Sequence, residues 1–119
     1  MFVVVPLALS LPTGAAGAAP PAPAKYAAGQ RCEDAMEQGR TLIRGLPASR
    51  AAWNGDATKS LRAFNLILDQ AQEGRRTCEA ALSDADLHDD RAEHVRLGAA
   101  WSTYMTEVDR ALALVTRKE

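Results

Sequence analysis

The sequence predicts an all-α protein in which three antiparallel helices form an up-down-up bundle, with one disulfide joining the first two helices. Three observations lead to this prediction. From Lys25 onward no segment shows the sustained alternation of apolar and polar residues that indicates strands. Apolar residues recur instead at steps of three and four in three stretches, whose short connections favour antiparallel neighbours. The two cysteines, Cys32 and Cys78, lie on the apolar faces of the first two stretches.

The N-terminal residues have the composition of an export signal, although no basic residue precedes Lys25. Phe2–Leu11 is uncharged and too short to span a bilayer, and small residues follow it. We expect a signal peptide over residues 1–18, with an alternative cleavage before Lys25, then an extended Ala/Pro-rich tether over 19–25 and one helical domain over 26–119. A cysteine pair behind such a segment indicates a disulfide in an oxidising compartment, so the protein is expected to be periplasmic or secreted.

The first helix is expected over about Tyr26–Arg44, because Cys32, Met36 and the apolar residues after them share one face. The sequence Gly45-Leu46-Pro47 is a typical C-terminal stop. The second helix is expected over about Ala57–Leu82, with Leu61, Phe64 and Cys78 on its apolar seam, preceded by a turn at Asn54-Gly55 and an N-cap at Asp56. Ser83, followed three residues later by Asp86, has the spacing of a capping box and is expected to start the third helix.

The predicted helix ends set the relative height of the two cysteines. Cys32 lies roughly 18 Å before the end of the first helix, and Cys78 lies roughly 32 Å into the second. From this mismatch of roughly 14 Å we expect the second helix to start below the end of the first, with the connection 45–56 descending between them. The disulfide is then feasible and contributes roughly 3–4 kcal/mol through the entropy of the unfolded chain.

Composition and motifs exclude several classes of function. The formal net charge of −1 provides no basic field for nucleic acid. No apolar run of membrane length follows Leu11, so no membrane insertion is expected after signal removal. Alanine is abundant and arginine outnumbers lysine, which we interpret as high-GC coding in a bacterium. We find no nucleophile elbow or buried acid/base pair, and the acidic run 84–90 has Asp89 and Val95 where a calcium loop needs glycine and glutamate. We therefore expect no enzyme, metal site or cofactor.

One cofactor alternative remains open. Met36 and His94 each lie about ten residues into helices that are expected to run the same way, so both could stand at one level and ligate haem iron. The segment Glu33–Glu37 resembles the surroundings of the axial methionine in b-type cytochromes that form periplasmic four-helix bundles, and the resemblance implies Met36 as a ligand. The axial histidine of that family belongs to a fourth helix, which this sequence does not predict.

The unequal lengths of the predicted helices suggest a contact surface. The third helix is expected to be the longest, about 34 residues, and its apolar last turns, Ala111–Val115, are expected to overhang the second helix. Either Trp53 in the connection folds over these turns, or they form an exposed patch that binds a protein partner or a second copy. The residues assigned to partner binding are Trp53, Leu112, Leu114 and Val115.

These observations predict a small exported accessory or binding protein, not an enzyme, that acts through a protein partner or a second copy on the long third helix. The alternative is a small-ligand or haem carrier with its ligand inside the bundle, flanked by Met36 and His94.

Overall fold

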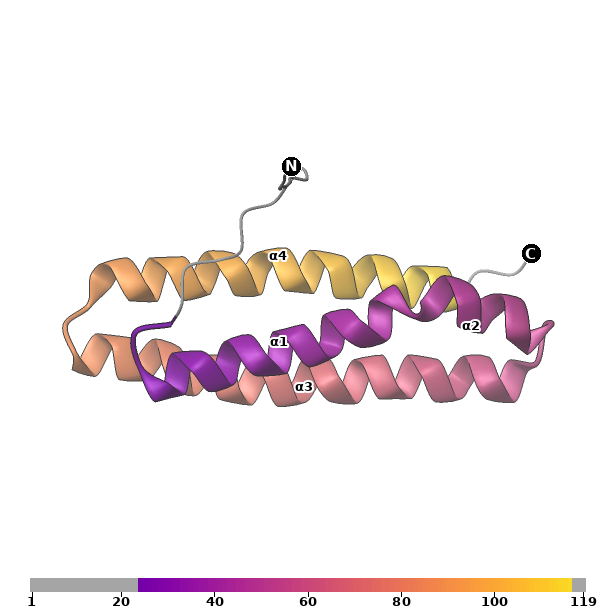
Figure 1. The fold of residues 1–119 in the computed structure, drawn as a ribbon, viewed down its shortest axis with the longest axis horizontal. Coiled ribbons are helices and arrows are strands. Elements are labelled where there is room, and N and C mark those ends of the chain that lie inside the picture. The colour runs from indigo at the N-terminus through magenta and orange to yellow at the C-terminus, as the bar shows by residue number, and fades with distance from the viewer. Residues whose placement is uncertain (1–23, 117–119) are drawn as a thin grey trace, which may run out of the picture.

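A computed structural model of the protein describes residues 24–116, and all its regular elements are helices (Figure 1). The described helices are α1 (Ala27–Arg44), α2 (Leu46–Trp53), α3 (Ala57–Leu87) and α4 (Arg91–Thr116). The all-α class is confirmed. The three-helix, up-down-up arrangement is not confirmed, because four helices are found. The expected signal peptide and most of the expected tether lie outside the described residues.

The additional helix, α2, starts where the sequence predicts a stop. α1 ends at Arg44 as expected, but Gly45 keeps right-handed helical angles and α2 begins at the next residue. Pro47 lies in the first turn of α2, where its missing N–H costs no helical hydrogen bond. Pro47, which was expected to follow the end of a helix, therefore lies at the start of the next one. The predicted turn at Asn54-Gly55 is present, and both residues have positive φ.

The height of α3 corrects the expected path of the connection. Cys32 and Cys78 form a disulfide, with their Cα atoms 4.5 Å apart. Because Cys78 is farther from the start of α3 than Cys32 is from the end of α1, α3 must begin beyond the end of α1, not below it. The connection therefore rises. α2 continues in the direction of α1 (Figure 1), and its eight residues supply about 12 Å of the roughly 14 Å needed.

The boundary between α3 and α4 also differs from the prediction. Ser83 does not start a helix, because α3 continues through it to Leu87. The break lies at residues 88–90, where Asp89 has a positive φ of 53°. A carboxylate oxygen of Asp90 then accepts a hydrogen bond from the Glu93 backbone N–H at 3.0 Å and caps α4. α3 is thus 31 residues long and α4 26, so the last helix is not the longest.

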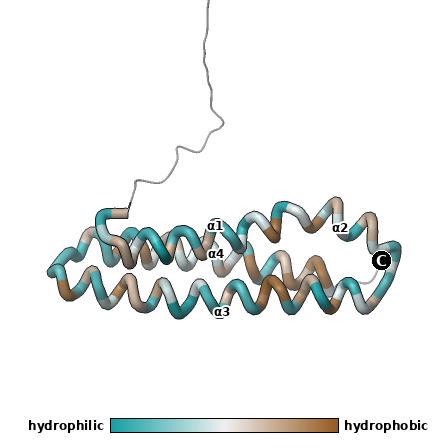
Figure 2. Tube along the Cα trace, turned by 60° about the horizontal axis from the view of Figure 1, so that its bottom comes forward, coloured by the Kyte–Doolittle hydropathy of each residue, from teal (hydrophilic) through white to brown (hydrophobic). Residues whose placement is uncertain are grey.

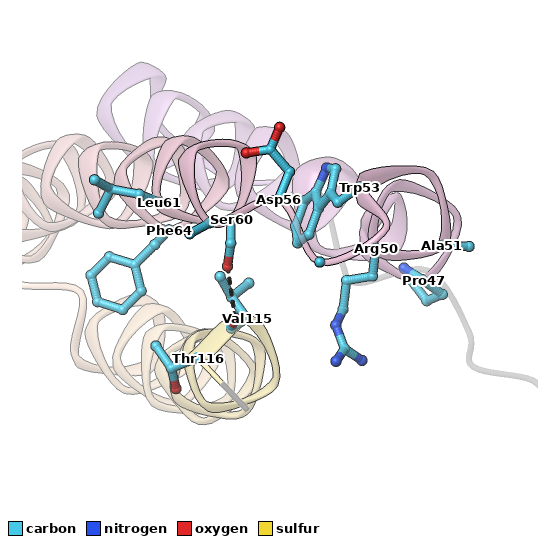
Figure 3. A pocket seen from close by; sticks show the side chains of 12 residues that line it. Pro47, Arg50, Ala51, Trp53, Asp56, Ser60, Leu61, Phe64, Val115 and Thr116 are labelled. Carbon is cyan, nitrogen blue, oxygen red and sulfur yellow. Dashed lines mark hydrogen bonds between the residues drawn. The ribbon is translucent and has the colours of Figure 1, made fainter. Parts of the chain in front are cut away.

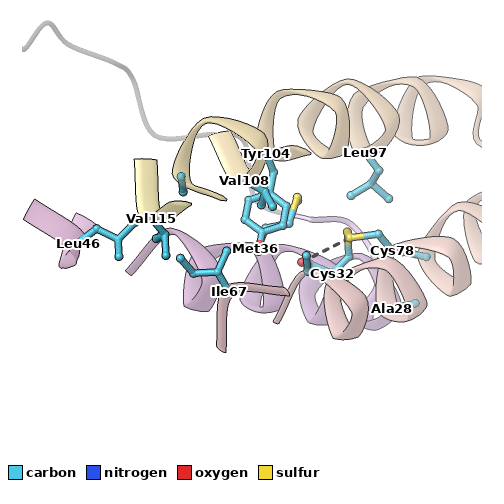
Figure 4. Close-up of a cluster of buried hydrophobic side chains, with 13 residues drawn as sticks. Ala28, Cys32, Met36, Leu46, Ile67, Cys78, Leu97, Tyr104, Val108 and Val115 are labelled. Atoms are coloured by element: carbon cyan, nitrogen blue, oxygen red, sulfur yellow. Dashed lines mark hydrogen bonds between the residues drawn. A yellow bond between two sulfur atoms is a disulfide. The ribbon is translucent and has the colours of Figure 1, made fainter. Parts of the chain in front are cut away.

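The core is formed where α1, α3 and α4 meet, and much of it consists of small residues (Figure 4). Tyr104 of α4 is fully buried and lies against Gly39 of α1, where an added Cβ would come 1.9 Å from the tyrosine hydroxyl oxygen. Gly74 of α3 similarly lies against the ring of Trp101. The helices approach closely only because these positions lack side chains. Figure 2 shows that the hydrophobic positions of α3 are denser toward the α2 end.

Candidate functional site

An open groove of about 940 Å³ lies at the end of the bundle that contains α2 (Figure 3). α2, the first two turns of α3 and the last turn of α4 form its walls. Most of its lining is apolar, and Arg50, Asp56 and two hydroxyl groups provide the polar atoms. The lining residues are Pro47, Arg50, Ala51, Trp53, Gly55, Asp56, Ala57, Ser60, Leu61, Phe64, Val115 and Thr116.

Local interactions hold the walls of the groove in place. The Asp56 carboxylate accepts hydrogen bonds from the backbone N–H groups of Thr58 and Lys59, which confirms the predicted N-cap of α3. The Ser60 hydroxyl donates to the Val115 carbonyl oxygen at 2.9 Å and so ties the start of α3 to the end of α4. The left-handed turn after Trp53 directs the chain back into α3 and leaves the indole on the groove wall (Figure 3).

The four residues assigned to partner binding lie close to this groove, but they do not overhang α3. Val115 is buried and level with Ser60 near the start of α3, because the connection rises and lifts that start. Trp53 is half-buried and, like Val115, lines the groove. Leu112 and Leu114 are half-buried against the core, and Leu114 also lines a smaller groove of about 310 Å³ beside α2. The expected overhang is therefore absent, and the apolar surface at this end is concave.

Sequence reasoning missed two residues of the groove. Leu61 and Phe64 belong to the apolar seam predicted for the second helix, and the prediction placed both inside the bundle. In the structure Phe64 is half-buried, whereas Leu61 remains 60% exposed. Both lie in the first turns of α3, where α1 has already ended and only the short α2 lies alongside. The twelve-residue segment 45–56 between the predicted helices was the available signal that part of this seam lacks a long neighbour.

Met36 and His94 do not stand at one level. The side-chain hydrogen bonds that join α1 to α4 connect residues 63 to 67 apart in sequence, so Met36 lies level with the middle of α4. His94 is the fourth residue of α4, not the tenth, and lies level with the start of α1. The offset is about seven residues, or roughly 10 Å along the helices. Met36 packs in the core near Tyr104 and Val108 (Figure 4), and this pair cannot ligate one iron.

A polar cluster occupies the opposite end of the bundle, where α1 starts beside the α3–α4 turn. Its centre is Glu93, a buried carboxylate. Arg96 donates two hydrogen bonds to Glu93, at 3.0 and 2.7 Å, and also binds Glu33 of α1. The Lys25 backbone N–H adds a further bond to Glu93. The Arg96 hydrogen bonds lower the pKa of Glu93 despite its burial, and the two carboxylates raise the pKa of Arg96.

The same cluster holds the turn between α3 and α4. The Tyr26 hydroxyl donates to the Asp90 carboxylate at 2.9 Å, and the Tyr26 ring stacks on His88 with 3.9 Å between the ring centroids. This hydrogen bond raises the pKa of Tyr26. The pKa of Asp90 is lowered, first by the Glu93 backbone N–H and then by Tyr26. These contacts join the start of α1 to the α3–α4 turn, and we refer to Tyr26, Asp90, Glu93 and Arg96 together as the clamp.

Within residues 24–116, no three His, Cys, Asp or Glu side chains are grouped in a way that could hold a metal ion. Among the same residues no helix is both long enough and apolar enough to cross a membrane. Comparison with protein-family models, with curated proteins and with solved structures gives no match to this chain.

Proposed function

We propose that the chain is a small exported binding protein that holds an apolar segment of a protein partner in the groove at the α2 end. The observation that carries this proposal is the groove itself, an apolar-walled concavity whose edge residue Leu61 is 60% exposed. Leaving a leucine and part of an indole in contact with water is unfavourable, and covering them on binding returns that free energy. Trp53 and Arg50 on the wall are residue types that are enriched in binding hot spots.

Export is supported by the disulfide and by the apolar N-terminal segment in the sequence. Disulfides persist in oxidising compartments and are rare in the reducing cytosol, and the Cys32–Cys78 bond is compatible with such a compartment. The contact surface proposed here differs from the one expected from the sequence. It is formed jointly by α2, the start of α3 and the end of α4, and the last helix supplies only one wall.

The proposal is tested by placing a photo-crosslinking residue, benzoylphenylalanine, at Leu61 in the groove and, in a matched variant, at Leu66. Both leucines are exposed positions of α3, at 60% and 51%, but Leu66 does not line the groove. We expect irradiation in the producing cell to give a discrete protein adduct from position 61 and none from position 66. Equal labelling from both positions, or no adduct from either, would rule out the groove as a protein-binding site.

A small-ligand carrier is the second candidate, because a groove of about 940 Å³ falls within the size range of small-molecule sites. Native mass spectrometry of the freshly purified chain distinguishes the two. If a small molecule is bound, the Leu61→Asp substitution releases it and no protein adduct forms at position 61, the groove holds a small ligand and not a protein partner. An unliganded mass together with a protein adduct supports the binding-protein proposal.

A further inference from the structure

At the end of the bundle opposite the groove, the turn between α3 and α4 presents one leucine to solvent. Leu87, the last residue of α3, is 86% exposed, the highest value among the large apolar side chains in the described part of the chain. The residues around it are mostly acidic: positions 84 to 91 carry four carboxylates and one arginine, and one of these carboxylates, Asp90, pairs with Lys25. The turn is therefore an apolar tip surrounded by negative charge.

This tip is held rigidly. The backbone N–H groups of His88 and Asp89 donate to the carbonyl oxygens of Asp84 and Asp86, and the Asp90 N–H donates to Ala85. Tyr26, which directly precedes α1, stacks on His88 and donates a hydrogen bond to Asp90. A segment that is already fixed in one conformation loses little conformational entropy when it binds. Leu87 thus has the properties of a preorganised anchor and no pocket of its own.

The groove has the complementary properties. Its walls are mostly apolar. Positions 44 to 64, which form or flank two of these walls, carry four basic side chains and one carboxylate, and of these charged residues Arg50 and Asp56 line the groove itself. Leu61 and Leu87 belong to one continuous helix and stand about 39 Å apart along it, so the turn cannot enter the groove of its own chain. A second copy can bring an acidic tip to the basic end of the first, and opposite charges steer such an encounter.

We propose that the partner segment in the groove is the α3–α4 turn of a second copy, with Leu87 inserted between Trp53 and Phe64. The inference rests on the proposed function, because it uses the same groove. The contact is head-to-tail: each copy has one tip and one groove, at opposite ends. Such heterologous contacts extend into linear chains unless the rotation between copies closes a ring.

The test is the mass of the purified, oxidised chain in solution, measured by sedimentation velocity from about 10 µM to about 1 mM, a range that covers weak specific association. We expect the average mass to rise with concentration. We also expect the association to weaken in about 0.5 M salt, where interactions between exposed charges are screened. A monomer at every concentration in low salt would overturn the proposal.

Two variants locate the contact. Leu87→Asp removes the tip and Leu61→Asp changes the groove, so each variant alone should remain monomeric. An equimolar mixture should form a 1:1 dimer and nothing larger, since one copy keeps an intact groove and the other an intact tip. Leu66→Asp, on the same helix outside both features, should associate like the unmodified chain. Failure of the mixture to pair would overturn the head-to-tail contact.

The outcomes separate this inference from the function on which it rests. If the chain associates and Leu87→Asp leaves the association unchanged, the tip is not the occupant. If the chain is monomeric while position 61 crosslinks to a different protein, the groove remains a binding site and only the second copy is excluded. Absence of a groove-specific adduct removes both proposals.

Discussion

Around the disulfide, the helices meet through small residues, whereas at the α2 end they meet through large and partly exposed ones. In the first region α1 and α3 face each other with alanine, glycine and cysteine, and α4 inserts Tyr104 between them. In the second region Trp53, Leu61 and Phe64 line an open groove. Small residues let the helix backbones approach until no space remains between them. At the α2 end the neighbouring helix is short and the side chains are large, so a concavity remains. The first region thus provides stability, and the second contains the surface that we propose for binding.

The largest expected effect is loss of the disulfide, which would weaken the tightly packed region directly. We expect Cys32→Ala with Cys78→Ala to lower the free energy of unfolding by about 4 kcal/mol, because the bond closes a loop of 46 residues in the unfolded chain. Urea denaturation measures the change. Leu61→Ser in the groove is the matched control and should shift stability by less than about 0.5 kcal/mol. Equal losses from both variants would contradict the division into two regions.

A smaller effect tests the close approach itself. Gly39→Ala places a methyl group 1.9 Å from the Tyr104 hydroxyl oxygen, and we expect it to destabilise the protein by roughly 1–3 kcal/mol through overpacking. Gly98 of α4 has no atom within 4 Å of the corresponding position. Gly98→Ala should therefore have the opposite sign and stabilise the protein by roughly 0.5–1 kcal/mol, because alanine loses less entropy in a helix. Thermal unfolding of the two variants compares these signs, and a neutral Gly39→Ala would show that the helices can separate there.

The smallest expected effect concerns the clamp around Glu93, which closes the tightly packed region at its far end. Because the folded protein lowers the pKa of Glu93 below its ordinary value of 4.5, the carboxylate stabilises the fold above about pH 4.5, and this contribution disappears as the pH falls through the lowered pKa. We expect Glu93→Gln to cost roughly 1 kcal/mol at neutral pH and to flatten the acid limb of the stability profile.

Urea titrations between about pH 3 and pH 7 measure this limb. Glu79→Gln on the exposed face of α3 is the control, because within residues 24–116 its carboxylate pairs with the exposed Arg75. If both variants keep the acid limb of the unmodified chain, Glu93 does not contribute to acid sensitivity.

Much of the fold could be predicted because its signals are local. The end of α1 at Arg44, the N-cap at Asp56 and the Asn54-Gly55 turn all appear where the sequence indicates them. The start of α4 was misplaced because two similar capping signals compete. Ser83 and Asp86 have the same spacing as Asp90 and Glu93, and only the second pair forms a cap. Apolar residues continue at helical spacing past Ser83, so this spacing does not show which of the two signals ends α3.

The candidate groove was predicted only in part. Trp53 and Val115 were assigned to a binding surface and do line the groove, although the reason given, an overhanging helix, was wrong. The misplaced start of α4 made that helix appear longer than it is, and it also put Met36 and His94 at the same apparent height. Phe64 and Leu61 were placed in the core because helical periodicity identifies the apolar face of a helix without showing whether another helix covers it.

The sequence by itself determined the all-helical class, most of the face that α1 and α4 bury and the two cysteines available for pairing, because these depend on residue type and on the 3.6-residue period. For α3 it indicated only part of the buried face, including Ala71 and Cys78. Only the tertiary structure decided the relative heights of the helices. The disulfide sets Cys32 level with Cys78, so α3 begins beyond the end of α1, and α2 spans the difference. The position of each helix along the bundle axis results from contacts between segments that are distant in sequence. Because α3 begins beyond the end of α1, only the short α2 lies beside its first turns, and the groove stays open there.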